Sequence, residues 1–94
     1  MKPTAAAVVA ALCLAAGGAQ AQSGEKVVAA RGCNDCHGSA SRVGPAYKDI
    51  AAKHRDDKRA EARLVSKLKE GKAHLKVDAP DAELKAAIQY VLKQ

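Results

Sequence analysis

The most reactive and metal-binding side chains of the sequence lie together in the run Cys33-Asn34-Asp35-Cys36-His37. Thiols at this spacing can each form a thioether with one vinyl group of a haem, and the adjacent histidine then falls under the iron as an axial ligand. The run therefore predicts one covalently attached haem c. Two other uses of Cys33 and Cys36 stay open at this point, a local disulfide and a redox-active dithiol.

Residues 1–21 have the pattern of an export signal, which fits this chemistry because bacteria attach haem to such runs only after export. Lys2 supplies the positive start, Ala5 to Ala16 form a short apolar stretch, and Ala19-Gln20-Ala21 is the pattern that signal peptidase cuts. The apolar stretch is too short to cross a bilayer. We therefore expect a cleaved signal peptide over residues 1–21, a periplasmic protein without stable membrane insertion, and one domain over residues 22–94.

The remaining chain, residues 22–94, has few large aromatic side chains with which to fill a core. Tyr47 and Tyr90 are its aromatic residues, and it has no Phe or Trp. A buried haem, which is large, flat and apolar, would supply the missing surface, as cofactors commonly do in small domains. A disulfide between Cys33 and Cys36 would close a very short loop and contribute little to folding.

Apolar residues recur at helical spacing and no window alternates like a strand, so we expect an all-α domain with four helices. The first runs from about Ser23, a possible N-cap, to Arg31, and ends at Gly32. The third begins within residues 55–59 and stops at Gly71, before a loop over residues 72–78. The last is the clearest, with an apolar stripe of Leu84, Ala87, Ile88, Val91 and Leu92.

The first two helices carry specific expectations about which side chains face the core. In the first, these side chains are those of Val27, Val28 and Ala30. The second is opened by Pro45, since proline is well tolerated in a first turn. Its inward face should carry Tyr47, Ile50, Ala51 and His54.

These segments together resemble the small bacterial class I c-type cytochromes, of the short c551/c552-like kind. The likeness rests on Gly32-Cys33, the Cys-x-x-Cys-His run, the segment VGPAYKDIAAK over residues 43–53, and a final helix ending Tyr90-Val91-Leu92. The resemblance implies three main helices and a short fourth around a haem. It also implies that the carbonyl of Pro45 accepts a hydrogen bond from His37, and that the first and last helices cross near Gly32 and Tyr90.

The chain departs from this family at the second iron ligand. The family normally supplies a methionine before the last helix, but the one methionine of this chain is Met1, in the leader. His74 lies close to the place of the missing methionine, so we expect an iron held between His37 and His74. His54 is the rival ligand, and a sixth position that is open or otherwise filled is the third possibility.

The resemblance implies an electron carrier rather than an enzyme. Two imidazoles favour ferric iron more than the usual thioether does, which predicts a lowered reduction potential. No paired carboxylates, nucleophile–base arrangement or phosphate-binding loop stands out in the sequence. The alternative is a haem protein that binds NO, CO or O2 at an open or displaceable sixth site. A thiol–disulfide protein would need a βαβ pattern that the sequence lacks.

The chain is basic, with 16 Lys and Arg against 10 Asp and Glu and a net charge of +6. Lysines flank the expected distal ligand and the second helix: Lys67, Lys69, Lys72 and Lys76, then Lys48, Lys53 and Lys58. A positive collar around a haem edge would speed encounter with acidic redox partners. An exported haem protein with so few aromatics is a poor candidate for binding nucleic acid. We expect a monomer or a subunit of a redox complex.

Overall fold

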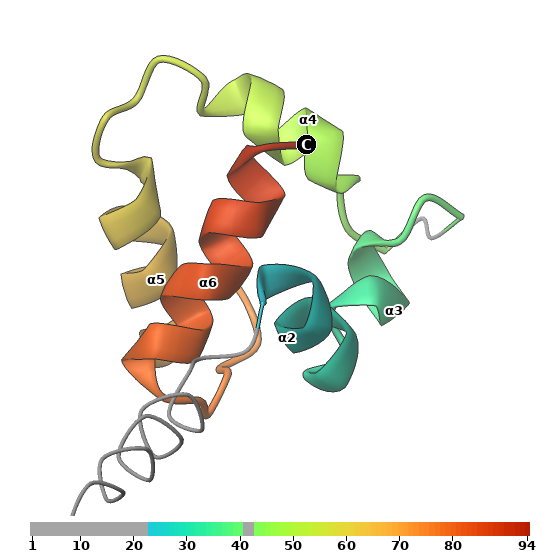
Figure 1. Cartoon of the computed structure of the whole chain (residues 1–94), viewed down its shortest axis with the longest axis vertical. Helices are drawn as coiled ribbons and strands as arrows, with labels where there is room; N and C mark the ends of the chain where they lie inside the picture. The colour runs from blue at the N-terminus through green and yellow to red at the C-terminus, as the bar shows by residue number, and fades with distance from the viewer. Residues whose placement is uncertain (1–22, 41–42) are drawn as a thin grey trace, which may run out of the picture.

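The computed structural model describes residues 23–40 and 43–94, and within them the chain is all-helical, as predicted. The predicted signal peptide lies outside the described residues. The helices are α2 (Gly24–Ala30), α3 (Cys33–His37), α4 (Tyr47–Lys53), α5 (Ala60–Glu70) and α6 (Asp81–Leu92) (Figure 1). None of the helices in these two ranges is long and apolar enough to span a membrane.

Helix α6 is the centre of the fold, with α2, α4 and α5 packed around it (Figure 1). Its apolar stripe divides between two buried clusters. One face joins α2, through a cluster of Val27, Val28, Ala87 and Val91. The other joins α5, through a cluster of Val65, Leu84 and Ile88. The stripe predicted from the sequence is therefore confirmed: four of its members are buried, and Leu92 packs against the second cluster.

The closest approach of α2 and α6 is at Gly24, not at Gly32 as the resemblance implied. A Cβ atom on Gly24 would collide with the backbone of Ala86 and the side chain of Tyr90, whereas one on Gly32 would touch only the carboxylate of Asp35. The helices can meet this closely because Gly24 has no side chain. Val28 is buried where α2 and α6 meet, so an aliphatic rather than an aromatic side chain packs between the two helices.

Local signals set the ends of the helices. The Ser23 hydroxyl accepts a hydrogen bond from the backbone of Lys26 and caps α2, as predicted. Gly32 and Gly71 both have left-handed backbones, with φ of 76° and 71°, and they end α2 and α5. Such a backbone is costly for residues with a Cβ atom, which explains glycine at both stops.

Four details differ from the sequence-based predictions. The haem motif is itself a helical turn, α3, so the described residues hold five helices rather than four. Helix α4 begins at Tyr47 with Ala46 as its N-cap, because the carbonyl of Pro45 is turned toward His37. Ala30 is exposed, since α2 turns its other face to α6. His54 caps the C-terminus of α4 instead of continuing its inward face.

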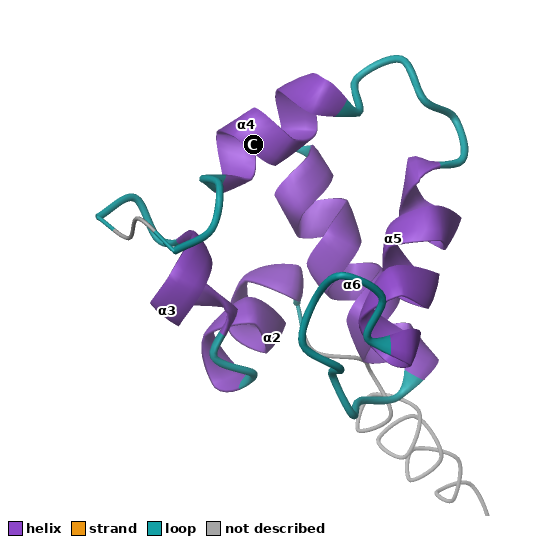
Figure 2. Cartoon of the chain, turned by 180° about the vertical axis from the view of Figure 1, so that it is seen from behind, coloured by secondary structure: helices purple, strands orange, loops and turns teal. Residues whose placement is uncertain are grey.

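The long connection between α5 and α6 runs across one face of the molecule, between α2 and α5 (Figure 2). Arg31, at the end of α2, ties this connection down. Its guanidinium donates to the carbonyl of Asp78 at 3.2 Å and pairs with Glu83 at 2.9 Å. The last part of this connection and the start of α6 are thus tied to the end of α2, the described helix that precedes the haem motif.

Candidate haem site

Helix α3 presents both cysteines and His37 within one short helical stretch. The thiols of Cys33 and Cys36 are unbridged and partly buried. Burial raises the pKa of the Cys33 thiol, and the nearby carboxylate of Asp35 adds to this effect. A thiol that resists ionisation is a poor nucleophile for disulfide exchange, which argues against the redox-dithiol alternative.

His37 is held from the side of α4. Its Nδ1 atom lies 2.7 Å from the carbonyl oxygen of Pro45, the contact that the family resemblance implied. That carbonyl can only accept, so Nδ1 carries the proton and Nε2 keeps its lone pair for a metal. An imidazole with a backbone acceptor on its far nitrogen is the usual arrangement of a metal-ligating histidine.

Gly44 is the second residue that holds His37, and sequence reasoning gave it no role of its own. Its amide donates to the carbonyl of Cys36 at 2.8 Å. A Cβ atom at this position would lie 2.8 Å from Cε1 and 2.9 Å from Nδ1 of His37. Glycine therefore allows the loop to close directly over the imidazole.

Tyr47 completes the surroundings of His37. Its ring lies 5.9 Å from the imidazole, centroid to centroid, and packs edge-on against Tyr90 at 6.1 Å. Its hydroxyl donates to Oδ1 of Asn34 at 2.6 Å and so joins α4 to α3. Burial raises the pKa of Tyr47 to about 12, with smaller contributions from Cys33 and Tyr90. No signal in the sequence pointed to Asn34, because it occupies a variable position of the motif.

His74 lies on the segment of residues 71–77, which we call the distal loop. Its imidazole is nearly parallel to that of His37, with an interplanar angle of 5° and ring centroids 6.0 Å apart. The Nδ1 atom of His74 lies 2.7 Å from the carbonyl oxygen of Leu75. This contact again leaves Nε2 as the nitrogen with a free lone pair.

The separation of the two imidazoles is the one that a single iron between them would require. A metal–imidazole bond is about 2 Å long and the ring centre lies about 1 Å beyond the nitrogen, so two rings on opposite sides of one metal have centroids about 6 Å apart. The separation of His37 and His74 matches this value. Both side chains have the tautomer that a metal ligand needs, and the two thiols stand beside His37 for attachment of the porphyrin.

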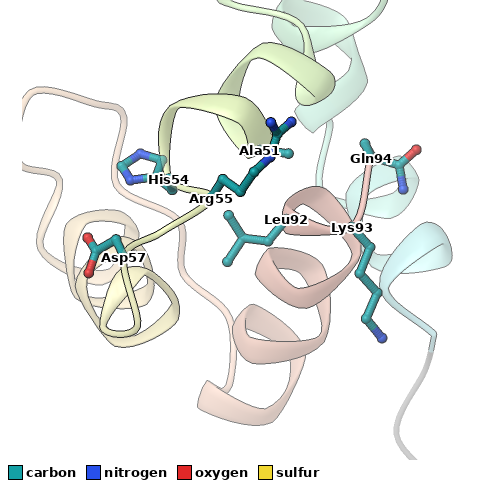
Figure 3. Close-up of a pocket in the computed structure, with 7 residues that line it drawn as sticks. All are labelled: Ala51, His54, Arg55, Asp57, Leu92, Lys93 and Gln94. Carbon is teal, nitrogen blue, oxygen red and sulfur yellow. The ribbon is translucent and has the colours of Figure 1, made fainter.

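His54, the rival ligand, belongs to a different part of the surface. It lines a cavity of about 380 Å³ where the C-terminal ends of α4 and α6 meet, together with Ala51, Arg55, Asp57, Leu92, Lys93 and Gln94 (Figure 3). Neither axial candidate lines this cavity. His54 itself is half-buried and caps the C-terminus of α4, which is an ordinary structural role for a histidine at a helix end. The geometry therefore favours His74 over His54.

The lysines near the distal loop are not all available to a partner. Lys69 pairs with Asp81 at 2.8 Å, and Lys72 pairs with Glu70 at 3.1 Å. Lys67 and Lys76 have no ion pair among the described residues. The expected positive collar is consequently weaker beside His74 than the sequence alone suggested.

Comparison with known proteins identifies the family to which this site belongs. No family model matches the chain. It is 40% identical over 74 residues to cytochrome c-551 of Allochromatium vinosum, covering 65% of this chain and 74% of the relative. It is 36% identical over 76 residues to cytochrome c-552 of Hydrogenobacter thermophilus, covering 72% and 78%. The chain belongs to the small class I c-type cytochromes. Cytochrome c-551 of Pseudomonas aeruginosa is a further relative, 44% identical over 59 residues, covering 62% of this chain and 57% of the relative.

Membership of this family establishes the chemistry of the protein at a general level. This cytochrome has one covalently attached haem c and transfers electrons, and it is not an enzyme. The all-helical fold around α6 is consistent with that assignment. The sequence predicts the cysteines, His37 and His74 as site residues, but not the contributions of Gly44 and Leu75. Of these two, only Gly44 had a signal, its place in the VGPAY segment.

Proposed function

We propose that this protein is a periplasmic electron carrier whose haem iron is bound by His37 and His74, with a lowered reduction potential. The observation that carries the proposal is the pair of parallel imidazoles 6.0 Å apart, each with its Nδ1 on a backbone carbonyl. In this site Cys33 and Cys36 anchor the porphyrin. The haem, when bound, supplies one-electron chemistry between ferric and ferrous iron.

The lowered reduction potential follows from the atom that binds the iron at its sixth position. An imidazole nitrogen stabilises ferric iron more than the thioether of methionine, which this mature chain lacks. The carbonyls of Pro45 and Leu75 strengthen the effect, because a hydrogen bond to Nδ1 raises the basicity of the imidazole. Both contacts measure 2.7 Å, so the two axial ligands are polarised alike.

Export to the periplasm is part of the same proposal. It is supported by the leader pattern over residues 1–21 and by the covalent haem motif. The mass of the purified protein tests it, since a mature chain that begins at Gln22 and carries one haem has a unique mass. A protein that retains residues 1–21 would contradict this part of the proposal.

Acidic redox partners are proposed from the remaining surface charge. Lys67 and Lys76 beside the distal loop, with Lys48, Lys53 and Lys58 near α4, form no ion pair among the described residues. Positive side chains around the haem edge raise the rate of encounter with acidic surfaces, and added salt screens the effect. Rates of electron exchange with an acidic partner should therefore fall as ionic strength rises.

The second candidate function is reversible binding of a small ligand such as NO, CO or O2. One observation favours it, because His74 is exposed on a loop rather than enclosed by helices. In this case an incoming ligand would displace His74. A ferrous sample mixed with CO distinguishes the two functions, since rapid stoichiometric binding supports the second and resistance supports electron transfer alone.

The decisive experiment compares the purified holoprotein with its His74→Ala and His74→Met variants by optical and electron paramagnetic resonance spectroscopy. The ferric native protein should be low-spin, with the rhombic spectrum of two imidazoles in parallel planes. His74→Ala should become high-spin, and added imidazole should restore the low-spin spectrum. His74→Met should raise the potential by on the order of 0.2 V, within the ~0.8 V range that axial ligands set.

The matched control is His54→Ala, which removes the other histidine from the cavity at the end of α4. Its spectrum and potential should equal those of the native protein. Unchanged spectra in His74→Ala would refute ligation by His74, and a change in His54→Ala would point to the rival ligand.

A further inference from the structure

The proposed removal of the leader makes Gln22 the first residue of the mature chain. The pattern Ala19-Gln20-Ala21 places the cut directly before it. An N-terminal glutamine differs chemically from an internal one, because its free α-amino nitrogen can reach its own side-chain amide carbon and close a five-membered ring. Cleavage before Gln22 therefore creates a reactive group as well as a new chain end.

Very little chain separates this end from the fold. Gln22 itself precedes the described residues, and α2 begins only two positions later, at Gly24. Ser23 supplies the first hydrogen bonds of this helix. Its hydroxyl accepts from the amide of Lys26 at 3.4 Å, and its carbonyl oxygen accepts from the amide of Val27 at 3.0 Å. Both contacts would be lost with Ser23, and the two amides would lose their partners.

The first turn of α2 also forms the junction with α6. Gly24 meets the backbone of Ala86 and the side chain of Tyr90 so closely that a Cβ atom there would collide with both. The apolar side chains of α2 are buried against α6 in the same region, whereas Ser23 is exposed. Removal of only Gln22 and Ser23 by an aminopeptidase would therefore strip the helix cap and leave the helix junction at the chain end.

We propose that Gln22 cyclises to pyroglutamate once the leader is removed, and that this lactam protects the cap and the helix junction that follow it. The lone pair of the α-amino nitrogen attacks Cδ of the side-chain amide, and the bond from Cδ to the amide nitrogen breaks. That nitrogen takes the proton given up by the amine and leaves as ammonia, so no oxidant or other reactant is needed. The inference rests on the part of the proposed function in which the protein is exported and cut before Gln22.

Cyclisation changes the chain end in two ways. Aminopeptidases act on a free α-amino group, and the lactam has none. The positive charge of the amine is also lost, one residue before the cap of α2. The first N–H groups of a helix carry partial positive charge, so the loss of a cation next to them does not oppose formation of α2. The product is therefore compatible with the fold and resistant to trimming.

The test is the intact mass of the purified holoprotein after prolonged incubation at neutral pH and physiological temperature. The expected mass is that of residues 22–94 with one haem, less one molecule of ammonia. Gln22→Asn is the matched control, because its side chain is one methylene shorter and the same attack would close a strained four-membered ring. This variant should keep its full mass. Pyroglutamyl aminopeptidase should release one residue from the native protein and none from the variant.

The protective role is tested by treating both folded holoproteins with a general aminopeptidase. The native protein should keep its mass under conditions in which Gln22→Asn loses residues. Trimmed protein that lacks Ser23 should unfold at a lower urea concentration than the native protein, because the N-cap of α2 is gone. Equal resistance of the two proteins to trimming would overturn the protective role.

The measured masses separate this inference from the proposed function. A protein that retains residues 1–21 refutes cleavage of the leader and the inference with it. A chain that begins at Gln22 and still has its full mass after incubation overturns cyclisation alone, as does a chain cut at another residue. Ligation by His74 is tested independently, since the optical spectrum of Gln22→Asn should equal that of the native protein.

Discussion

The two candidate iron ligands have the same kind of hydrogen-bonding partner, a backbone carbonyl, but they are held in place differently. Each has its Nδ1 atom 2.7 Å from a backbone carbonyl. For His37 that carbonyl belongs to Pro45, eight residues away, and the ring is also enclosed by Gly44 and Tyr47. For His74 the carbonyl belongs to the next residue, and the side chain is exposed.

The difference teaches that the imidazole of a candidate ligand can be oriented by a hydrogen bond without being anchored to another helix. The surroundings of His37 join α3 to α4, so the imidazole cannot move unless two helices separate. The distal loop carries its own acceptor and can move as a unit with its tautomer preserved. If both histidines bind the iron as proposed, His37 should be the more firmly held ligand and His74 the more readily displaced one.

The largest expected effect comes from closing the space over His37. In Gly44→Ala the new Cβ atom would lie 2.8 Å from Cε1 of the imidazole, so either the loop or the ring must shift. Overpacking of this kind typically lowers the free energy of unfolding by about 1–3 kcal/mol. Urea unfolding of the holoprotein measures the loss.

Its matched control is Ser39→Ala, an exposed position in the same loop. The expected change in unfolding free energy is within about 0.5 kcal/mol. Equal stabilities of the two variants would show that His37 is not tightly enclosed, and the contrast with His74 would disappear.

Removing the hydroxyl of Tyr47, which also lies on the His37 side of the site, should lower the free energy of unfolding by a smaller amount. Tyr47→Phe loses the hydrogen bond to Asn34, which costs about 1 kcal/mol at neutral pH. Urea unfolding at neutral pH measures this cost. Tyr90→Phe is the control, since it alters the neighbouring ring of the same packed pair without removing that hydrogen bond.

Tyr47 also predicts how stability depends on alkaline pH. Its pKa is raised from 10.0 to about 12, mainly because burial disfavours the phenolate; the smaller contribution of the Cys33 charge is absent once that sulfur is bound to the haem. The unfolded chain then ionises first, so Tyr47 stabilises the fold fully below pH 10 and this contribution is lost between pH 10 and about 12. The ring is partly exposed, so the loss should be small. The native protein should destabilise more than Tyr47→Phe across this window, and parallel curves would contradict the assignment.

The smallest effect is expected at the ion pair between Lys69 and Asp81, which joins α5 to α6 outside the distal loop. Lys69 lowers the pKa of Asp81 by a hydrogen bond and by its charge. A carboxyl with a depressed pKa stabilises the fold above its unfolded pKa, and this contribution is lost as the pH falls. Because both side chains are exposed, Asp81→Asn should leave the thermal midpoint unchanged at physiological salt. A marked fall in the thermal midpoint would show that the Lys69–Asp81 pair stabilises the protein more than an exposed ion pair should.

Much of the fold was predictable because its signals are local. The stripe on α6 identifies a core helix by spacing alone, and Ser23 and Gly71 mark helix ends through their own side-chain and backbone chemistry. The crossing of α2 and α6 at Gly24 was misplaced, since which glycine meets another helix depends on how the two helices lie in space. Ala30 was placed inward for a related reason, because one apolar residue on a short helix does not fix the face that is buried.

For the candidate site, the sequence by itself determined the chemistry: two thiols and an imidazole at haem-attachment spacing, and no methionine after Met1 that could be a second iron ligand. Those are properties of residue type and order. Only the tertiary structure decided that His74, and not His54, lies parallel to His37 at 6.0 Å, and that Gly44 closes over the imidazole of His37. The physical reason is that these distances are fixed by the packing of α4 and α5 around α6, which no local pattern records.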